Sequence, residues 1–497
     1  MTGSRALWVL GGMLLPLWSF FAPVAQAQRT EDQVVRIFAT KKEVDKSAPW
    51  QFEEVTQQSF LGVVLDGGQI LTTAYAVGDA TFLEIQRFGA SRRDEATVEF
   101  VDYEVNLALI RPVMPQALAL AKPVALGDDI AIDDQVDIYK ARDAYQLSRM
   151  PASLQEVGLF AAVTSAYSLV SYQFKVQQTG LGWAEPVFRQ GRLVGMTTGQ
   201  DANFVHALPM GIIRHFIEDR HDGSYRGFPS IGVLLSSLVS PDMRRLLGAE
   251  KVQTGIRIAE VQADGGFENL LLPDDVLLEV DGTPVSEHGF FTHPKWGKVH
   301  LKYLINQHYG GDELKLKVLR HGQEMVVEHH LLRYDSNRTP VVSYRFGQPE
   351  PHLIFGGFVF QELSQDYLKQ WGRDWRDLAP LDLLFTLEYD NKPTADVSRR
   401  VIFLSRVLAD GFNRGYSDFR HVIVDSVNGE RVTSIASLRQ ALAHPVTTNG
   451  RAYARIKFTR DGGEAILEYA GLTDAHRRIA KTYEVKTPAS FFQWPVP

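Results

Sequence analysis

A series of short apolar runs between Val34 and Val205 places the strongest constraint on the fold of this chain. The runs are rich in Val, Ile, Phe and Tyr, and Gly, Asp and Pro separate them; they include FLGVVLD, GQILTTAYAV, TFLEIQRF, ATVEFVDY, LALIRPV, QVDIYKA, YQFKVQQ and RLVGMTTG. This pattern predicts strands, and their even spacing predicts an antiparallel barrel or a pair of sandwiches. Helical spacing in GIIRHFIEDRHDG, from Gly211 to Gly223, predicts a helix that closes the region.

Two further units of mixed strands and short helices follow. The second unit opens with GFPSIGVLLSSL and the third contains LIFGGFVFQEL near its start. In both units a V-D-G or V-N-G turn precedes a helix, and a charged hairpin comes last. This repeated order indicates two divergent copies of one α+β module.

The N-terminus has the pattern of an export signal. Arg5 precedes the apolar stretch ALWVLGGMLLPLWSFFAPV, and Ala25 and Ala27 are the small residues of an A-x-A cleavage site. We expect cleavage after Ala27, with no stable membrane span afterwards. An uncleaved anchor is the alternative, because the stretch is almost long enough to span a bilayer. The chain has no cysteine, which excludes disulfides and thiolate chemistry and suits a bacterial periplasm.

The charged residues do not indicate a nucleic acid, a metal or a cofactor as partner. The net charge is −7, with no basic footprint for nucleic acid. His329 and His330 are adjacent on a predicted strand, so their side chains point to opposite faces and would not share a metal ion. We therefore expect no cofactor, no metal site and no nucleic-acid partner.

Segments along most of the chain resemble the HtrA/Deg family of exported serine proteases. FLGVVLDGGQILTTAYAV is similar to the strand before the family's catalytic His, DYEVNLALIRP to the segment with its Asp, and GLGWAEPVFRQGRLVGMTTG to its nucleophile loop. The openings of the second and third units resemble PDZ domains of the Deg branch. The resemblance implies a mainly β fold, in which a trypsin-like double antiparallel β-barrel is followed by two α+β PDZ-like domains.

The resemblance also divides the chain into domains. The expected parts are a signal peptide at 1–27, a degenerate trypsin-like protease domain at 28–223, a first PDZ domain at 224–335, a linker at 336–350, a second, divergent PDZ-like domain at 351–472 and a C-terminal tail at 473–497.

At each place where the family has a catalytic residue, this chain has a different residue type. Tyr75 stands at the place of the His, Asn106 at that of the Asp and Trp183 at that of the Ser. Ala184 and Glu185 replace the two glycines of the nucleophile loop. We therefore assign no catalytic residues and call the domain a pseudoprotease.

These replacements remove the chemistry of serine attack. Histidine acts as the base because it titrates near neutral pH, whereas an ordinary tyrosine titrates near ~10. Residues 1–205 contain no histidine, and the first one is His206. We expect the indole of Trp183 to pack into or over the former cleft, and side chains to refill the turn whose backbone N–H groups would form an oxyanion hole. A rewired site that uses Tyr, Lys and Glu groups, such as Lys175 and Glu185, is the alternative.

The opening loop of the second unit is the candidate peptide-binding site. A PDZ domain adds a peptide C-terminus as an extra strand and holds its carboxylate in a nest of backbone N–H groups. In this loop Phe228 and Ile231 would line an apolar pocket, and a tight turn before a core strand is the alternative. The resemblance assigns peptide binding to Phe228, Pro229, Ser230, Ile231, Gly232, Val233 and Leu234. In the third unit the similar place is held by Gly356, Gly357, Phe358 and Val359.

These observations favour a catalytically inactive HtrA/Deg-like protein. It would bind C-terminal peptides or unfolded exported proteins through its PDZ domains, as a chaperone, adaptor or regulator of envelope protein quality control. The resemblance further implies a homo-oligomer such as a trimer. The alternatives are an active serine-type endopeptidase with a non-standard site and a purely structural envelope protein.

Overall fold

The computed structural model describes residues 30–143, 146–161, 163–177, 179–220, 223–372 and 374–494. The expected signal peptide, at residues 1–27, lies outside these ranges. In the described ranges no helix combines the length and the apolar character that crossing a membrane requires.

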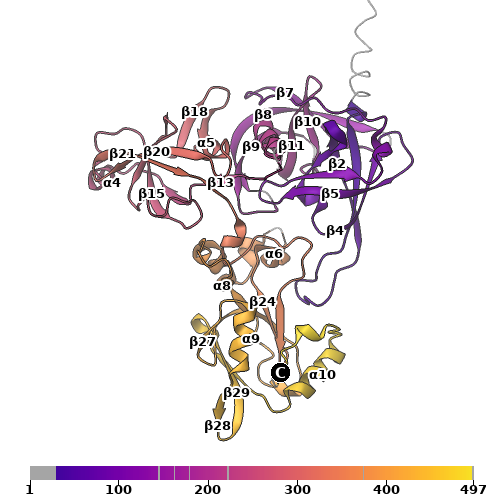
Figure 1. Cartoon of the computed structure of the whole chain (residues 1–497), viewed down its shortest axis with the longest axis vertical. Helices are drawn as coiled ribbons and strands as arrows, with labels where there is room; N and C mark the ends of the chain where they lie inside the picture. The colour runs from indigo at the N-terminus through magenta and orange to yellow at the C-terminus, as the bar shows by residue number, and fades with distance from the viewer. Residues whose placement is uncertain are drawn as a thin grey trace, which may run out of the picture.

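Two closed antiparallel barrels form the first part of the fold (Figure 1). The first has the strand order β1-β2-β3-β6-β5-β4 and consists of β1 Val34–Lys41, β2 Thr56–Val64, β3 Ile70–Thr72, β4 Ala80–Arg87, β5 Asp94–Asp102 and β6 Leu107–Pro112. The second has the order β10-β11-β12-β9-β8-β7 and consists of β7 Gln135–Ala141, β8 Leu147–Ala161, β9 Ser168–Lys175, β10 Pro186–Arg189, β11 Arg192–Asp201 and β12 Phe204–Pro209. The predicted mainly β fold is confirmed.

One apolar core joins the two barrels. It contains Leu61 and Leu107 from the first barrel, Phe188 and Met196 from the second, and Phe216 from α3 Met210–Glu218. In β2 the side chains change from exposed at the start of the strand to continuously buried at its end. That change explains why FLGVV is an unbroken apolar run, because Phe60 and Val64 face the inside of the first barrel while Leu61 and Val63 face the core between the barrels. A short helix, α2 Ala74–Val77, follows β3 at the mouth of this interface.

The second unit is a sheet with the order β14-β15-β16-β20-β21 and two short helices. Its elements are β13 Pro229–Ser230, β14 Val233–Ser236, α4 Pro241–Leu246, β15 Ile256–Val261, β16 Val276–Val280, β17 Thr283–Pro284, β18 Phe290–His293, β19 Gly297–His300, α5 Lys302–Asn306, β20 Glu313–Arg320, β21 Gln323–His330 and β22 Leu332–Arg333. Within the described strands, β14 pairs with β15 alone, so it lies at the edge of the sheet.

The hairpin β18–β19 attaches the second unit to the second barrel. Its Trp296 is 6% exposed and packs in the same apolar cluster as Tyr172. The Trp296 Nε1–H donates to the carbonyl oxygen of Ile130 at 2.6 Å. The second unit is therefore held against the barrel by a buried aromatic anchor.

The Trp296→Ala change is expected to loosen this attachment. Truncating a buried Trp removes its apolar contacts and leaves a cavity, at a cost of about 3 kcal/mol in the free energy of unfolding. Urea unfolding followed by tryptophan fluorescence measures this loss, and limited proteolysis reports whether the second unit separates first. Phe290→Ala is a matched control, because Phe290 lies on the same hairpin but is 37% exposed. An equal loss in both variants would contradict the anchoring role.

The third unit has the strand order β23-β24-β25-β26-β29-β28, and β30 pairs with β29. Its elements are β23 His352–Phe355, β24 Phe358–Glu362, α6 Gln365–Leu368, α7 Trp375–Leu378, α8 Leu381–Phe385, the π-helical turn η5 Thr386–Asp390, β25 Ile402–Val407, β26 Val422–Val427, β27 Glu430–Arg431, α9 Ile435–Ala443, β28 Val446–Thr448, β29 Arg451–Phe458, β30 Glu464–Glu468 and α10 Leu472–Thr482.

The predicted C-terminal tail, residues 473–497, is in large part integral to the third unit. Helix α10 covers Leu472–Thr482, and the chain then returns along β23, where Phe492 N–H donates to the carbonyl oxygen of Ile354 at 2.9 Å. Phe491 and Phe492 are 5% and 2% exposed. The prediction of a separate tail was wrong because apolar residues so close to the end of the chain complete two core clusters.

Candidate functional site between the barrels

The three positions compared with a catalytic triad come together at the junction of the barrels. Tyr75 lies on α2, Asn106 directly before β6, and Trp183 in the turn before β10. Asn106 Oδ1 accepts a hydrogen bond from Tyr75 N–H at 2.9 Å. The rings of Tyr75 and Trp183 lie 5.0 Å apart between centroids, at 37°. Residues that are far apart in the sequence therefore form one site.

The environment of Tyr75 keeps its phenol from acting as a base at neutral pH. Burial raises the pKa of the Tyr75 phenol, so this group stays protonated at neutral pH. Lys41 lies close by, with Nζ 4.7 Å from the centroid of the Tyr75 ring, and donates to the Tyr75 carbonyl oxygen at 2.7 Å. Lys41 is 4% exposed, and burial lowers its pKa. Sequence analysis missed this residue because only the barrel brings the end of β1 next to α2.

Asn106 has a structural role in this arrangement. Its side chain is buried and its φ is +55°, a left-handed conformation that Asn adopts more readily than most residues. Its amide oxygen fixes the backbone of the Tyr75 turn. A neutral amide in this position holds the turn but supplies no charge to a neighbouring group.

Three consecutive backbone N–H groups of the Trp183 turn, those of Leu181, Gly182 and Trp183, are bound by side chains. Gly182 N–H and Trp183 N–H both donate to Glu185 Oε2, each at 2.8 Å. The Thr197 hydroxyl donates to the same oxygen. One residue earlier, Leu181 N–H donates to Gln200 Oε1 at 2.8 Å. The Glu185 side chain is therefore an internal ligand of the turn.

The pair of donors on Glu185 has the geometry that an oxyanion requires. Two N–H groups at 2.8 Å from one oxygen match the donor distances of an oxyanion hole, and the oxygen here belongs to the protein's own carboxylate. The sequence predicted that side chains refill this turn, with the Trp183 indole over the cleft. The indole lies against Tyr75 but stays 43% exposed. Glu185 fills the N–H pair because a carboxylate accepts hydrogen bonds and an indole does not.

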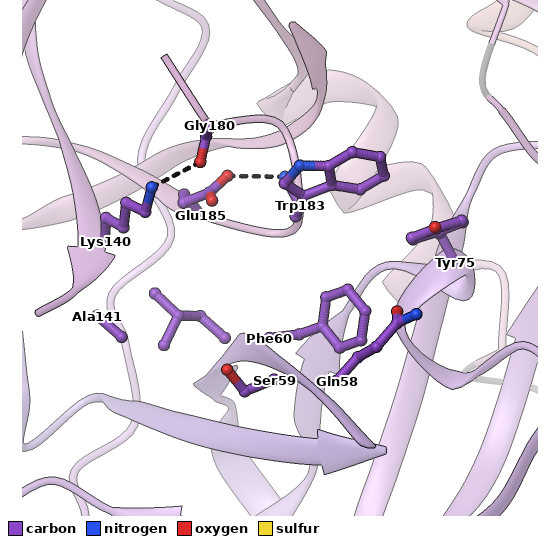
Figure 2. A pocket seen from close by; sticks show the side chains of 10 residues that line it. Gln58, Ser59, Phe60, Tyr75, Lys140, Ala141, Gly180, Trp183 and Glu185 are labelled. Atoms are coloured by element: carbon purple, nitrogen blue, oxygen red, sulfur yellow. Dashed lines mark hydrogen bonds between the residues drawn. The ribbon is translucent and has the colours of Figure 1, made fainter. Parts of the chain in front are cut away.

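An open cleft of about 360 Å³ remains in front of this turn. Figure 2 shows Trp183 extending toward Tyr75, with Phe60 and Gln58 below. The ammonium group of Lys140 donates to the Gly180 carbonyl oxygen at 2.7 Å on the opposite side. The lining residues are Gln58, Ser59, Phe60, Leu61, Tyr75, Lys140, Ala141, Gly180, Trp183 and Glu185.

Among the residues that the structure describes, neither a histidine nor Lys175 lines the cleft. His206 stacks on Phe160 with centroids 4.0 Å apart, and burial lowers its pKa. Ser171, the serine nearest to the turn in the preceding sequence, donates to the Ala207 carbonyl oxygen at 3.0 Å inside the second barrel. Within the described residues, no hydrogen bond connects Lys175 or His206 to Tyr75 or Trp183.

The comparisons with known proteins agree with this architecture. The chain is 26% identical over 475 residues to the Arabidopsis thaliana protein "Protease Do-like 2, chloroplastic", which covers 92% of this chain and 74% of that protein. It is 24% identical over 463 residues to "Putative protease Do-like 11, mitochondrial" of the same organism, with 92% and 75% covered. The chain is a homologue of the HtrA/Do-like proteases. The PDZ domain family matches residues 341–491.

A solved structure described as "HtrA-type protease AlgW with decapeptide" is 16% identical to this Do-like homologue, with a TM-score of 0.48, and the match covers 63% of this chain and 98% of that one.

The PDZ match extends on both sides of the range 351–472 predicted for this domain, into the predicted linker and tail.

The peptide-binding loop predicted for the second unit is partly buried against the barrel of the Do-like homologue. Phe228 is 2% exposed and stacks on His215 of α3 with centroids 4.0 Å apart. The carbonyl oxygen of Pro229 accepts from the Tyr167 hydroxyl at 2.7 Å. Phe228 therefore belongs to the connection that docks the unit on the barrel, and its contact with a peptide stays a prediction.

The centre of the same loop is tightly packed. Gly232 has a φ of +61°, and its N–H donates to Ser230 Oγ at 3.0 Å. Ile231 is 6% exposed, and a Cβ added to Gly265 would lie 2.1 Å from the Ile231 carbonyl carbon. A peptide carboxylate would need N–H donors from this loop. The Gly232 N–H is already bound to a side chain of the same loop.

The edge strand after this loop is more accessible, and it differs from its counterpart in the third unit. Val233 and Leu234 begin β14, and Leu234 is 45% exposed. In the third unit Gly356 and Gly357 form the turn between β23 and β24, and Phe358 and Val359 are completely buried. Because β24 pairs with both β23 and β25, a peptide could not be added to it as a strand.

Acidic pH is expected to weaken the contact between the barrel and the second unit at His215. This side chain is 7% exposed, and burial lowers its pKa to about 4. In the unfolded chain it titrates near ~6.5, so its contribution is complete above that pH and is lost as the pH falls toward 4. Between pH 7 and pH 5 the free energy of unfolding of the wild type should therefore fall by about 2 kcal/mol more than that of the His215→Phe variant. Urea unfolding at both pH values measures this difference. The same change in the wild type and in the variant would contradict the prediction.

Proposed function

We propose that this HtrA/Do-like homologue is a non-proteolytic peptide-binding protein. The observation that carries the proposal is the hydrogen bonding of Glu185, whose carboxylate takes both Gly182 N–H and Trp183 N–H. An oxyanion formed in the cleft would have to displace a buried carboxylate held by a third donor, Thr197. Acyl transfer without N–H donors loses the largest single contribution to its transition state.

The residues around the cleft support the same conclusion. Trp183 has no nucleophilic atom, Asn106 has no charge, and the phenol of Tyr75 has a raised pKa. Lys41 contacts Tyr75 through its carbonyl oxygen and ring face. A lysine held in this way supports the turn and is not positioned to activate a hydroxyl.

The proposed ligand is an extended segment of an exported or unfolded protein, added as a strand to β14. The exposed side chain of Leu234 and the unpaired edge of β14 support this position. We propose an adaptor or chaperone role in the bacterial periplasm, as a homo-oligomer such as a trimer. Sedimentation of the mature chain tests the oligomeric state.

The absence of proteolysis is tested with the purified mature protein. It is incubated with unfolded casein and, separately, with a serine-directed fluorophosphonate, with trypsin as the positive control. We expect neither cleavage nor labelling. Time-dependent casein cleavage that follows the protein through purification would contradict the proposal.

Peptide binding at β14 is tested by fluorescence anisotropy with extended peptides that have a free or an amidated C-terminus. The Leu234→Glu variant is expected to weaken binding about tenfold, because a charge at the strand edge disturbs the apolar contact. Leu246→Glu is the matched control, since Leu246 lies on α4 and is 78% exposed. Equal affinity in the wild type and in both variants would remove β14 as the site.

A further inference from the structure

A cavity of about 440 Å³ in the third unit has more basic than acidic residues in its lining. It lies where α8 and η5 meet the ends of β25 and β26, and Lys392 at its rim bonds to Glu260 of the second unit at 2.7 Å. The acidic residues in the lining are Asp390 and Asp425. The basic residues in the lining are Lys392, Arg399, Arg400, Arg431 and Arg460. In a chain of net charge −7, this is a local excess of positive charge.

Two of these cations are not held by an ion pair or a side-chain hydrogen bond to another described residue. Arg460 is bound to Asp382 at 2.6 Å, and the Arg400 guanidinium donates to backbone carbonyl oxygens. Within the described residues, the side chains of Arg399 and Arg431 make neither an ion pair nor a hydrogen bond. Both are exposed, so their guanidinium groups are available to a ligand. Planar guanidinium groups bind carboxylates by paired hydrogen bonds.

An exposed apolar stripe leads along α8 and η5 into the same cavity. Leu381, Phe385 and Tyr389 follow one another at intervals of four residues, so they share one helix face. Their side chains are 79%, 40% and 66% exposed, and the rings of Phe385 and Tyr389 stack with centroids 4.8 Å apart. Tyr389 belongs to both the stripe and the cavity lining. Exposed apolar residues grouped in this way mark interaction surfaces.

The π-helical geometry of η5 is a separate indication of a functional site. Residues Thr386–Asp390 form a π-helical turn, and Thr386, Tyr389 and Asp390 line the cavity. π-Helical turns are rare and occur frequently at functional sites, because they are retained despite their weaker packing. Here the turn begins directly after Phe385 and carries Tyr389, where the stripe reaches the basic residues.

We propose that the stripe and the basic cavity together bind an acidic peptide segment that also carries apolar side chains. Aspartate or glutamate side chains would bind Arg399 and Arg431, and apolar side chains would pack on Leu381 and Phe385. The stripe extends from Leu381 to Tyr389, eight helical rises of about 1.5 Å or about 12 Å, which suits a peptide better than a compact anion. An anionic membrane fits less well, because Asp382, Glu388 and Asp390 interrupt the same helical segment.

The test uses a fluorescent peptide in which Asp and Glu alternate with Leu and Phe, amidated at its C-terminus so that carboxylate capture at β14 does not contribute. The full mature chain is expected to bind it saturably. The Arg399→Gln/Arg431→Gln variant should bind about tenfold or more weakly, and Leu381→Ser should also weaken binding. Arg92→Gln/Arg477→Gln is the matched control, because these arginines are exposed and lie outside the cavity.

The proposal is overturned if both double variants lose affinity equally, or if a peptide with Lys in place of each acid binds as well as the acidic one. It is also overturned if phosphatidylglycerol vesicles bind through Arg399 and Arg431 while the acidic peptide does not bind. Binding by Leu234→Glu should be unchanged, which separates this site from the one proposed at β14.

Discussion

Introducing the family's catalytic side chains at the three predicted triad positions is expected to give only trace esterase activity. In a chain with Tyr75→His, Asn106→Asp and Trp183→Ser, the introduced side chains stand at positions that lie together in the structure. Adding Glu185→Gly is expected to raise ester hydrolysis about 10²–10³-fold over the triple variant, the amount that oxyanion-hole donors contribute in serine proteases. Hydrolysis of an activated ester and labelling by a fluorophosphonate measure this difference.

The physical reason lies in the competition for two N–H groups. Glu185 Oε2 is 2.8 Å from both Gly182 N and Trp183 N, and the side chain is 5% exposed. A developing oxyanion would have to replace a full carboxylate that is already in place and attached to the same turn. Only removal of that carboxylate leaves the donors open to a substrate.

The control for this experiment is Glu156→Gly in the triple variant, because Glu156 is exposed on β8. Circular dichroism verifies that all variants are folded. If the triple variant is as active as the variant that also lacks Glu185, the carboxylate does not block the turn. If Glu156→Gly raises activity as much as Glu185→Gly, the gain comes from flexibility and not from the freed N–H groups.

Lys46→Ala is expected to separate the third unit from the first barrel. Lys46 Nζ lies 2.5 Å from Glu350 Oε1 and 2.6 Å from Asp366 Oδ2, and the three side chains are 16%, 6% and 8% exposed. The two carboxylates hold the pKa of the lysine above its ordinary value. Removing the cation leaves two buried carboxylates without compensation, at a cost of about 3–5 kcal/mol.

The contacts around Lys46 explain why this loss should appear as undocking. The segment between β1 and β2 also reaches the third unit through Trp50, whose Nε1–H donates to the Tyr483 carbonyl oxygen at 3.2 Å. Limited proteolysis of this segment and small-angle scattering measure the separation. Lys122→Ala is the control, because the Lys122–Asp32 pair is exposed and such pairs contribute at most about 1 kcal/mol. Unchanged scattering and protease resistance in Lys46→Ala would contradict the prediction.

Much of the fold could be predicted from the sequence because strand formation depends on local patterns. The apolar runs and their turn residues predicted the strands of both barrels, and helical spacing predicted α3. The prediction failed at the C-terminus, where Phe491 and Phe492 complete core clusters that other parts of the chain begin. The contact of Phe228 with α3 was also not predicted, because local sequence does not indicate whether an apolar residue faces a ligand or a neighbouring domain.

In the candidate site, too, the sequence predicted some residues and missed those that only tertiary contacts bring to the site. Sequence comparison selected Tyr75, Asn106 and Trp183, and the structure brings these positions together. Lys41 and Gln200 were not found, because their contacts with the site depend on strand pairing and loop closure. The local sequence around Lys41 and Gln200 does not indicate that these side chains contact the site.

By itself, the sequence determined which side chains the given chain offers: there is no histidine before His206, no cysteine, and a tryptophan, Trp183, at the predicted nucleophile position. These are properties of side chains, and no folding can supply an absent functional group. Only the tertiary structure decided that Glu185 occupies the N–H pair and that β14 has an accessible edge while β24 has none. Such occupancy depends on which distant groups meet, and this depends on the packing of the whole chain.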